Sequence, residues 1–178
     1  MSGPEAAALP VPMFPLGTVL FPAQPLPLHI FEPRYRQLTS DCLRGNHEFG
    51  VVLIERGHEV GGDDTRFSIG TVARISEAVQ LPDGRWALLA VGGRRIGVVT
   101  WLPDDPYPVA LVENLPERRL EHRAASLLSS TEGAVRRILA MAAELGEPIS
   151  APVTFTLDED PHTALWQLCA VAPLTAVD

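Results

Sequence analysis

Lysine is absent from the 178-residue sequence, in which all 14 basic residues are arginine. A Ser-Lys protease dyad needs an amine whose pKa can be lowered, and a Walker A loop needs a lysine on the β- and γ-phosphates. Schiff-base chemistry needs a lysine amine as well. The residue types therefore exclude these protease, ATPase and Schiff-base activities, and we expect the chain not to be an enzyme.

Cysteine is scarce, and the histidines are not grouped. Cys42 and Cys169 occupy apolar positions of expected helices without CxxC spacing, so we expect buried free thiols and a reducing, cytoplasmic location. The five histidines lie in separate segments without HxxxH or HExxH spacing, so we expect neither a metal site nor any other cofactor. A nucleophile built from Cys42 and His47 is not expected, because buried thiols without an activating partner are inert. The first residues also lack the pattern of a signal peptide.

Positive charge is in deficit. The formal net charge is −8 and the sequence pI is about 5.1, so the averaged field repels nucleic acid and anionic membranes. Arginine doublets nevertheless occur at 94–95, 118–119 and 136–137, together with Arg123, and they leave an RNA-binding module open as an alternative. No aromatic residues are interleaved with these arginines, which argues against nucleic-acid binding.

Acidic residues cluster at 63–64, 104–105 and 158–160. Each cluster lies in an expected turn or helix start, where aspartate makes local hydrogen bonds, so we interpret them as structural rather than as acid-base pairs or cation ligands. A small-molecule-binding or hydrolytic domain is a second alternative. It would require a closed pocket with convergent polar groups.

A long uncharged run occupies the N-terminal part of the chain. No residue from Ala6 to Phe31 is charged, a length that would span a bilayer as a helix. Six prolines in this run remove backbone donors and favour extended geometry, which forbids such a helix. Because proline is poorly tolerated in central strands, we expect short extended pieces at sheet edges or bulges. The run therefore predicts protein core and no membrane association.

Helical spacing follows this run directly. Glu32 is placed to cap, and Pro33 to start, a helix that ends at Gly45. Its apolar positions are spaced by four, three and four residues, at Phe31, Tyr35, Leu38 and Cys42. We therefore predict a docked helix over residues 33–44, directly after a sheet edge.

The remaining pattern predicts more strands and then helices. Strands are expected at 49–54, 69–81, 85–91, 95–101 and 107–113, with a loop at 57–65, a hairpin turn at 82–84 and a bend at 92–93. A helix is expected from 120 to 145, with a kink or break at Gly133, and another from Pro161, capped by Asp160. We expect three parts: a flexible tail at 1–9, a barrel or sandwich of strands at 10–116 and a helical subdomain at 117–178. The last residues look like the approach to a further helix, so truncation of the helical subdomain is left open.

Several segments, in this order and spacing, resemble the substrate-binding (N-terminal) domain of Lon proteases: FPLGTVLFP, PLHIFEPRYR, FGVVLI, IGTVARI and LPDGRW. Ordered agreement over several segments is more specific than one short motif. The segment PLHIFEPRYR is similar to the version in stand-alone bacterial members of this family and in RING-finger proteins carrying such a domain. The resemblance implies an α+β fold: a PUA-like β-barrel of about six strands with one inserted helix, followed by a C-terminal helical segment.

The resemblance also implies a function. We expect a non-catalytic, ATP-independent domain that binds proteins or peptides and is linked to protein quality control. Its expected partners are unfolded or extended polypeptides, or a component of the degradation machinery, with no nucleic acid and no membrane; the oligomeric state is left open.

The candidate peptide-binding residues are Phe31, Glu32, Arg34 and Tyr35. They combine charged groups with an amphipathic ring beside an expected sheet edge, which could accept an added strand. In this hypothesis the Tyr35 ring buries one face and keeps its hydroxyl exposed.

Overall fold

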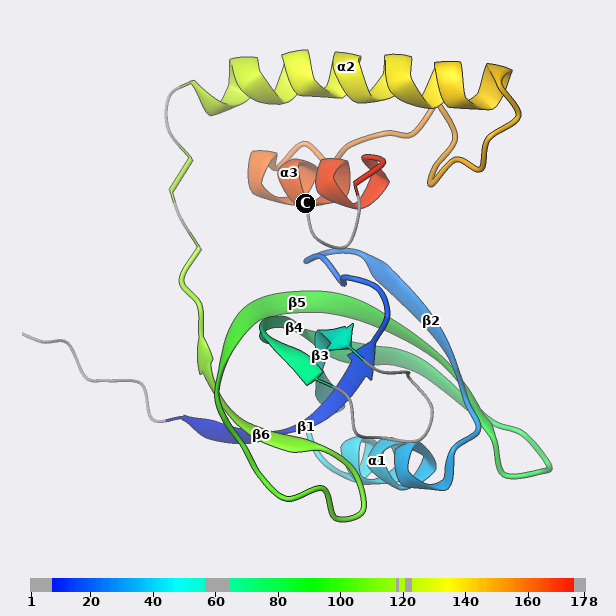
Figure 1. Cartoon of the computed structure of the whole chain (residues 1–178), viewed down its shortest axis with the longest axis vertical. Helices are drawn as coiled ribbons and strands as arrows, with labels where there is room; N and C mark the ends of the chain where they lie inside the picture. Colours follow the sequence, from blue (N-terminus) through cyan, green and yellow to red (C-terminus); the bar gives the residue numbers. More distant parts are fainter. Residues whose placement is uncertain (1–7, 57–64, 118, 121–122, 175–178) are drawn as a thin grey trace, which may run out of the picture. The chain divides into compact units, whose positions relative to one another are not determined.

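The computed structural model describes residues 8–56, 65–117, 119–120 and 123–174. Its internal contacts divide the chain into two compact units, Met1–Pro116 and Glu117–Asp178. We call them the barrel unit and the helical unit and describe each by itself (Figure 1). The loop expected at 57–65 and most of the tail expected at 1–9 lie outside the described residues, and Leu9 already belongs to the first strand.

The barrel unit contains six strands and one helix inserted after the second strand. In chain order they are β1 (Leu9–Leu16), β2 (Pro25–Ile30), α1 (Pro33–Arg44), β3 (Glu48–Arg56), β4 (Thr65–Gln80), β5 (Trp86–Trp101) and β6 (Val109–Asn114). The sheet order is β2-β5-β4-β3-β1-β6, and an additional pairing of β5 with β6 closes the barrel (Figure 1). The predicted α+β class, strand number and inserted helix are confirmed.

The closing strand β5 differs from the prediction of two strands separated by a bend. It is one strand of 16 residues that runs through the two glycines (Figure 1). Its first part pairs with β2, from Trp86 to Val91, and its second part pairs with β6, from Ile96 to Trp101. The glycines lie where β5 changes partner. A Cβ at Gly92 would lie 2.2 Å from the carbonyl oxygen of Phe21, so glycine is required here by close approach of another backbone.

The expectation that the prolines of the N-terminal run lie at sheet edges is wrong for β1. It lies between β3 and β6 in the sheet, but its first half pairs only with β6 and its second half only with β3. The Met13 N–H donates to the Pro108 carbonyl on the β6 side at 2.8 Å. Backbone groups point to alternate sides along a strand, so the nitrogens of Pro10 and Pro12 point to the β3 side, where the first half of β1 has no partner strand. The nitrogen of Pro15 points to the β6 side, where the second half of β1 has no partner strand. The prolines therefore remove no ladder hydrogen bond. The edge expectation holds for β2, which pairs only with β5.

The larger of two core clusters among the described residues of the barrel unit includes the buried face of α1. The buried α1 residues Tyr35, Leu38 and Cys42 pack in one cluster with Phe14 and Phe49. The rings of Phe14 and Tyr35 stack at a centroid distance of 4.1 Å. The apolar spacing therefore predicted the buried face correctly at Tyr35, Leu38 and Cys42, but not at Phe31, which lies before the helix and is exposed. Among the described residues, no helix is long and apolar enough to cross a bilayer, and the uncharged N-terminal run forms strands and turns.

A polar contact fastens the outer side of α1 to the loop before β6. Asp41 accepts hydrogen bonds from the Tyr107 hydroxyl at 2.8 Å and from the Gln37 amide at 2.9 Å. Burial, and then the Asp41 hydrogen bond, raise the pKa of Tyr107 from 10.0 to about 12. Burial, and then the Asp41 charge, raise the pKa of the Cys42 thiol from 9.0 to about 12. The Cys42 Sγ donates to the Glu48 carbonyl at 3.2 Å, and Cys42 is the buried free thiol that was expected.

We expect the barrel unit to lose stability at alkaline pH because of the Tyr107 hydroxyl and the Cys42 thiol. Both are raised above their unfolded values, so their stabilising contribution is complete below pH 9.0 and is lost as the pH rises toward about 12. No lysine titrates in this window. Urea unfolding between pH 8 and 12 should therefore show a steep fall for the wild type and a shallower one for Tyr107→Phe, which lacks the ionisable hydroxyl. Equal slopes for the two proteins would contradict the coupling of Tyr107 to Asp41.

The helical unit contains α2 (Ala124–Glu144) and α3 (Pro161–Val171). Its core is formed by Val135 and Leu139 of α2 with Phe155 and Leu168. The helix α2 passes through Gly133 without a break. The predicted cap of α3 is confirmed, because the Asp160 carboxylate accepts from the Thr163 N–H at 2.9 Å, and this bond lowers the pKa of Asp160.

Arg136 holds the segment between the two helices. Its guanidinium donates to the carbonyl oxygens of Val153 at 2.5 Å and Phe155 at 2.6 Å, and it pairs with Glu132 at 2.7 Å. It also lies 4.1 Å from the centroid of the Phe155 ring. This arginine is therefore a structural residue of the helical unit.

Candidate functional site

The four candidate binding residues lie where β2 ends and α1 begins. The Glu32 carbonyl accepts the Arg36 N–H at 2.9 Å, but the Glu32 side chain makes no capping bond, contrary to the expected cap. Its carboxylate instead accepts from the Arg34 Nε at 3.1 Å. This ion pair spans the first turn of α1, where Pro33 needs no donor.

The four side chains differ greatly in exposure. Phe31 is 53% exposed, whereas Tyr35 is only 3% exposed. Glu32 and Arg34 are partly buried, and the Arg34 guanidinium lies 4.6 Å from the centroid of the Tyr35 ring. The expectation of a Tyr35 hydroxyl open to solvent is therefore wrong, because the ring is buried between Arg34 and Phe14. The surface here is an exposed phenyl ring beside an ion pair.

The edge of β2 offers few donors to an added strand. The Gly92 N–H donates to the Gln24 carbonyl at 2.9 Å, so by alternation Pro25, Pro27 and His29 direct their backbone groups away from β5. Two of these three positions are prolines, and proline on an edge is a known barrier to strand pairing. Recognition at this place would therefore rely on side chains rather than on a backbone ladder.

A second exposed apolar surface was missed by the sequence interpretation. Phe67 and Ile69 of β4 are exposed, as is Val99 of β5. Ile69 pairs with Gly97, which lies two residues before Val99 on the neighbouring strand. We call these residues the β4–β5 patch. The alternation of β4 could have located it, since Phe67 and Ile69 share one face of the strand.

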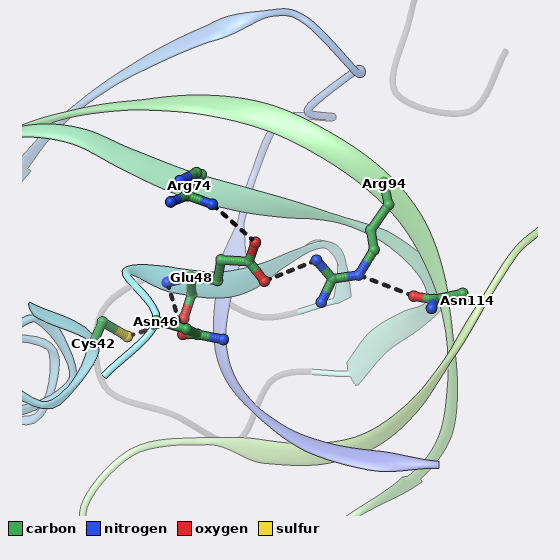
Figure 2. Close-up of polar contacts among 6 residues, drawn as sticks. All are labelled: Cys42, Asn46, Glu48, Arg74, Arg94 and Asn114. Atoms are coloured by element: carbon green, nitrogen blue, oxygen red, sulfur yellow. Dashed lines mark hydrogen bonds and ion pairs between the residues drawn. The ribbon is translucent and has the colours of Figure 1, made fainter. Parts of the chain in front are cut away.

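A polar network lies where β5 changes partner (Figure 2). Arg94 of β5 donates to the Glu48 carboxylate at 2.8 Å and to the Asn114 side chain at 3.0 Å. The other Glu48 oxygen lies 4.0 Å from Arg74 of β4. The network thus joins β3, β4, β5 and β6 at the seam of the barrel. No local pattern in the sequence pairs residues so far apart.

Ion pairs limit two of the alternatives: RNA binding by the arginine doublets, and a cation or acid-base site at the acidic clusters. Arg94 is bound within the barrel unit and Arg136 within the helical unit, each to a carboxylate, while Arg118 lies outside the described residues. Asp104 pairs with Arg66 at 3.0 Å, and Asp63 and Asp64 are not among the residues described. Within the described ranges, no three His, Cys, Asp or Glu side chains are grouped to hold a metal ion. Arg94 and Arg136, one arginine from each of two doublets, are therefore each engaged in an ion pair inside their own unit.

The profile of the family described as the ATP-dependent protease La (LON) substrate-binding domain matches residues 10–178. The chain belongs to this family.

The relatives of this Lon substrate-binding domain include much longer proteins that are named Lon proteases. Lon protease 2 from Herpetosiphon aurantiacus is 31% identical over 111 residues, which are 61% of this chain and 14% of that protein. Lon protease from Trichlorobacter lovleyi is 27% identical over 154 residues, which are 83% of this chain and 18% of that protein. The chain thus spans less than a fifth of the length of these relatives.

Solved structures agree with this assignment. The Lon N-terminal domain protein from Xanthomonas campestris superimposes with a TM-score of 0.59 and 28% identity, covering 93% of this chain and 99% of that one. The N-terminal domain of a Mycobacterium avium complex Lon protease superimposes with a TM-score of 0.57 and 16% identity, covering 78% of this chain and 72% of that one; this second likeness shows the fold. The family description names substrate binding as the role of this part of a Lon protease.

Proposed function

We propose that this Lon substrate-binding domain binds unfolded or extended polypeptide segments, without catalysis, as part of protein quality control. The family match over residues 10–178 carries this proposal, because the family is described by substrate binding. The absence of lysine supports the non-catalytic part, since no Ser-Lys dyad or Walker A loop can form. A cytoplasmic location remains our prediction from the free thiols.

The binding surface that we propose is centred on Phe31. Its ring is exposed at the end of β2, beside the Glu32–Arg34 ion pair. Unfolded polypeptides expose apolar side chains together with backbone amides, and an exposed aromatic ring beside charged groups can contact both. Tyr35 would contribute indirectly, because the Arg34 guanidinium packs on the buried Tyr35 ring and is held in position there. The donor-poor edge of β2 makes side-chain contacts the expected mode of binding.

The experiment is a fluorescence-anisotropy titration with α-lactalbumin that is kept unfolded by reduction and alkylation. This test polypeptide is acidic, as is the chain, so net electrostatic attraction does not drive binding. Phe31→Ala is expected to weaken binding about tenfold, the usual effect of truncating a central aromatic contact. Phe67→Ala is the matched control, because it removes an exposed phenyl ring from another surface of the same unit.

Comparing the two variants with the wild type tests separately whether the chain binds unfolded polypeptide and which surface binds it. Weaker binding by Phe31→Ala alone supports the proposed surface. Weaker binding by Phe67→Ala alone overturns this location and assigns recognition to the β4–β5 patch. Failure of the wild type to bind overturns the function itself.

A further inference from the structure

Among the described residues of the helical unit, the helix α2 buries one apolar face and leaves a second one exposed. Val135 and Leu139 are buried against Phe155 and Leu168. A different face carries apolar side chains whose exposed fractions range from 48% to 78%: Leu127, Ile138, Met141 and Leu145. An exposed apolar face of this kind on a helix indicates an interaction surface.

The spacing of the residues on this second face indicates that the partner is a helix. Its six positions follow one another at intervals of four and three residues in strict alternation, and we call them the outer seam: Leu127, Thr131, Ala134, Ile138, Met141 and Leu145. A repeat of seven residues keeps a seam directed at a second helix that packs at a shallow angle. The outer seam therefore fits a helix of similar length.

The charges at the ends of α2 favour an antiparallel partner. Arg123 stands at the N-cap and Glu144 in the last turn, with no acidic residue in the first turn and no basic residue in the last. This is the reverse of what the helix dipole favours. A second helix that runs the other way brings an acidic end to Arg123 and a basic end to Glu144. The helix α2 is thus complementary in charge to an antiparallel copy of itself.

We propose that α2 pairs antiparallel with α2 of a second copy of this chain, which makes the protein a homodimer. With the seams fully overlapped, Ala134 faces Ile138 of the second copy, and Thr131 faces Met141, so small residues meet large ones and the layers interdigitate. A parallel pair would instead place Ala134 against Ala134 and leave a void in the middle.

The same alignment gives the most exposed residue of the seam a place to bind. Leu145, which is 78% exposed, comes beside Leu127 of the second copy. Leu127 and Thr131 line an apolar groove of about 190 Å³ between α2 and Leu165 of α3. The side chain of Leu145 inserts there as a knob into a hole. Dimerisation also joins two polypeptide-binding barrels, which strengthens binding to long chains that reach both.

Association is tested with the full chain by sedimentation equilibrium. The wild type is expected to be dimeric at about 100 μM, and Ile138→Glu is expected to raise the dissociation constant roughly a hundredfold, by placing a charge in the seam. Ala143→Glu is the matched control, because it adds the same charge to an exposed position of α2 outside the seam. Monomeric wild type, or equal weakening by both variants, overturns the proposal; monomeric wild type would assign the seam to another part of the same chain or to a different protein.

Orientation is tested by cysteine crosslinking, which does not depend on the folding of Ile138→Glu. Under mild oxidation, L127C mixed with L145C is expected to form a disulfide-linked dimer. L127C alone is expected to stay uncrosslinked. Crosslinking of L127C with itself, or none in the mixture, overturns the antiparallel pairing.

Discussion

Replacing Tyr35 with alanine is expected to lower the free energy of unfolding of the barrel unit by about 4 kcal/mol. The side chain is 3% exposed, its ring stacks on Phe14 at 4.1 Å, and Arg34 rests on its other side. Truncation loses this burial and leaves a cavity under α1, in the centre of the larger core cluster. Urea unfolding followed by tryptophan fluorescence measures the change, because two of the three tryptophans, Trp86 and Trp101, lie in β5 of the barrel unit.

Phe31→Ala serves as the control for this experiment. It removes an aromatic ring from the same segment, but from an exposed position, so its effect on stability should stay below about 1 kcal/mol. Similar losses for the two variants would show that Tyr35 is not the core residue that its contacts indicate. The affinity of the folded Tyr35→Ala fraction then shows whether the ring also positions Arg34 for binding.

Replacing Gly70 with alanine should be nearly as damaging, although it adds a single methyl group. Gly70 pairs with Val52 of β3 and Ile96 of β5. A Cβ at this position would lie 2.3 Å from the Val51 carbonyl oxygen and 2.7 Å from a methyl of Val52. The first obstacle is backbone in the middle of the barrel, so β3 and β4 must separate, at a cost of about 3 kcal/mol.

Gly93→Ala is the matched control for this collision. It lies in β5 of the same barrel, and its nearest obstacle is the Val72 carbonyl oxygen at 3.3 Å, which a small shift accommodates. Chemical denaturation should place its stability within about 1 kcal/mol of the wild type. A Gly70→Ala protein as stable as Gly93→Ala would contradict the close packing of β3 against β4.

The elements predicted best from the sequence were those with a local physical cause. The helix α1 was predicted over its observed range, because Pro33 starts it and the apolar spacing continues until Gly45. The cap Asp160 and the helix after it followed from the same kind of local signal. These features depend on neighbours in the chain, and the sequence contains those neighbours.

The features that were missed depend on contacts between distant segments. Gly92 and Gly93 predicted a bend, yet β5 continues, because its glycines allow the close approach of Phe21 and a change of partner strand. The prolines of β1 are tolerated away from an edge, because each half of the strand has a partner on one side only. For the candidate site, the position at the start of α1 was predicted, but the exposure of Tyr35 was not. The apolar spacing of Tyr35 predicts burial, whereas its hydroxyl group favours contact with solvent, and the structure follows the spacing.

Binding of unfolded polypeptide is tested most directly by comparing two forms of one protein. In the anisotropy titration, the wild-type chain should bind reduced and alkylated α-lactalbumin at least about tenfold more tightly than the folded, disulfide-intact form, because only the unfolded form exposes its apolar side chains. Equal affinity for the two forms, or no binding to either, would contradict the proposed function.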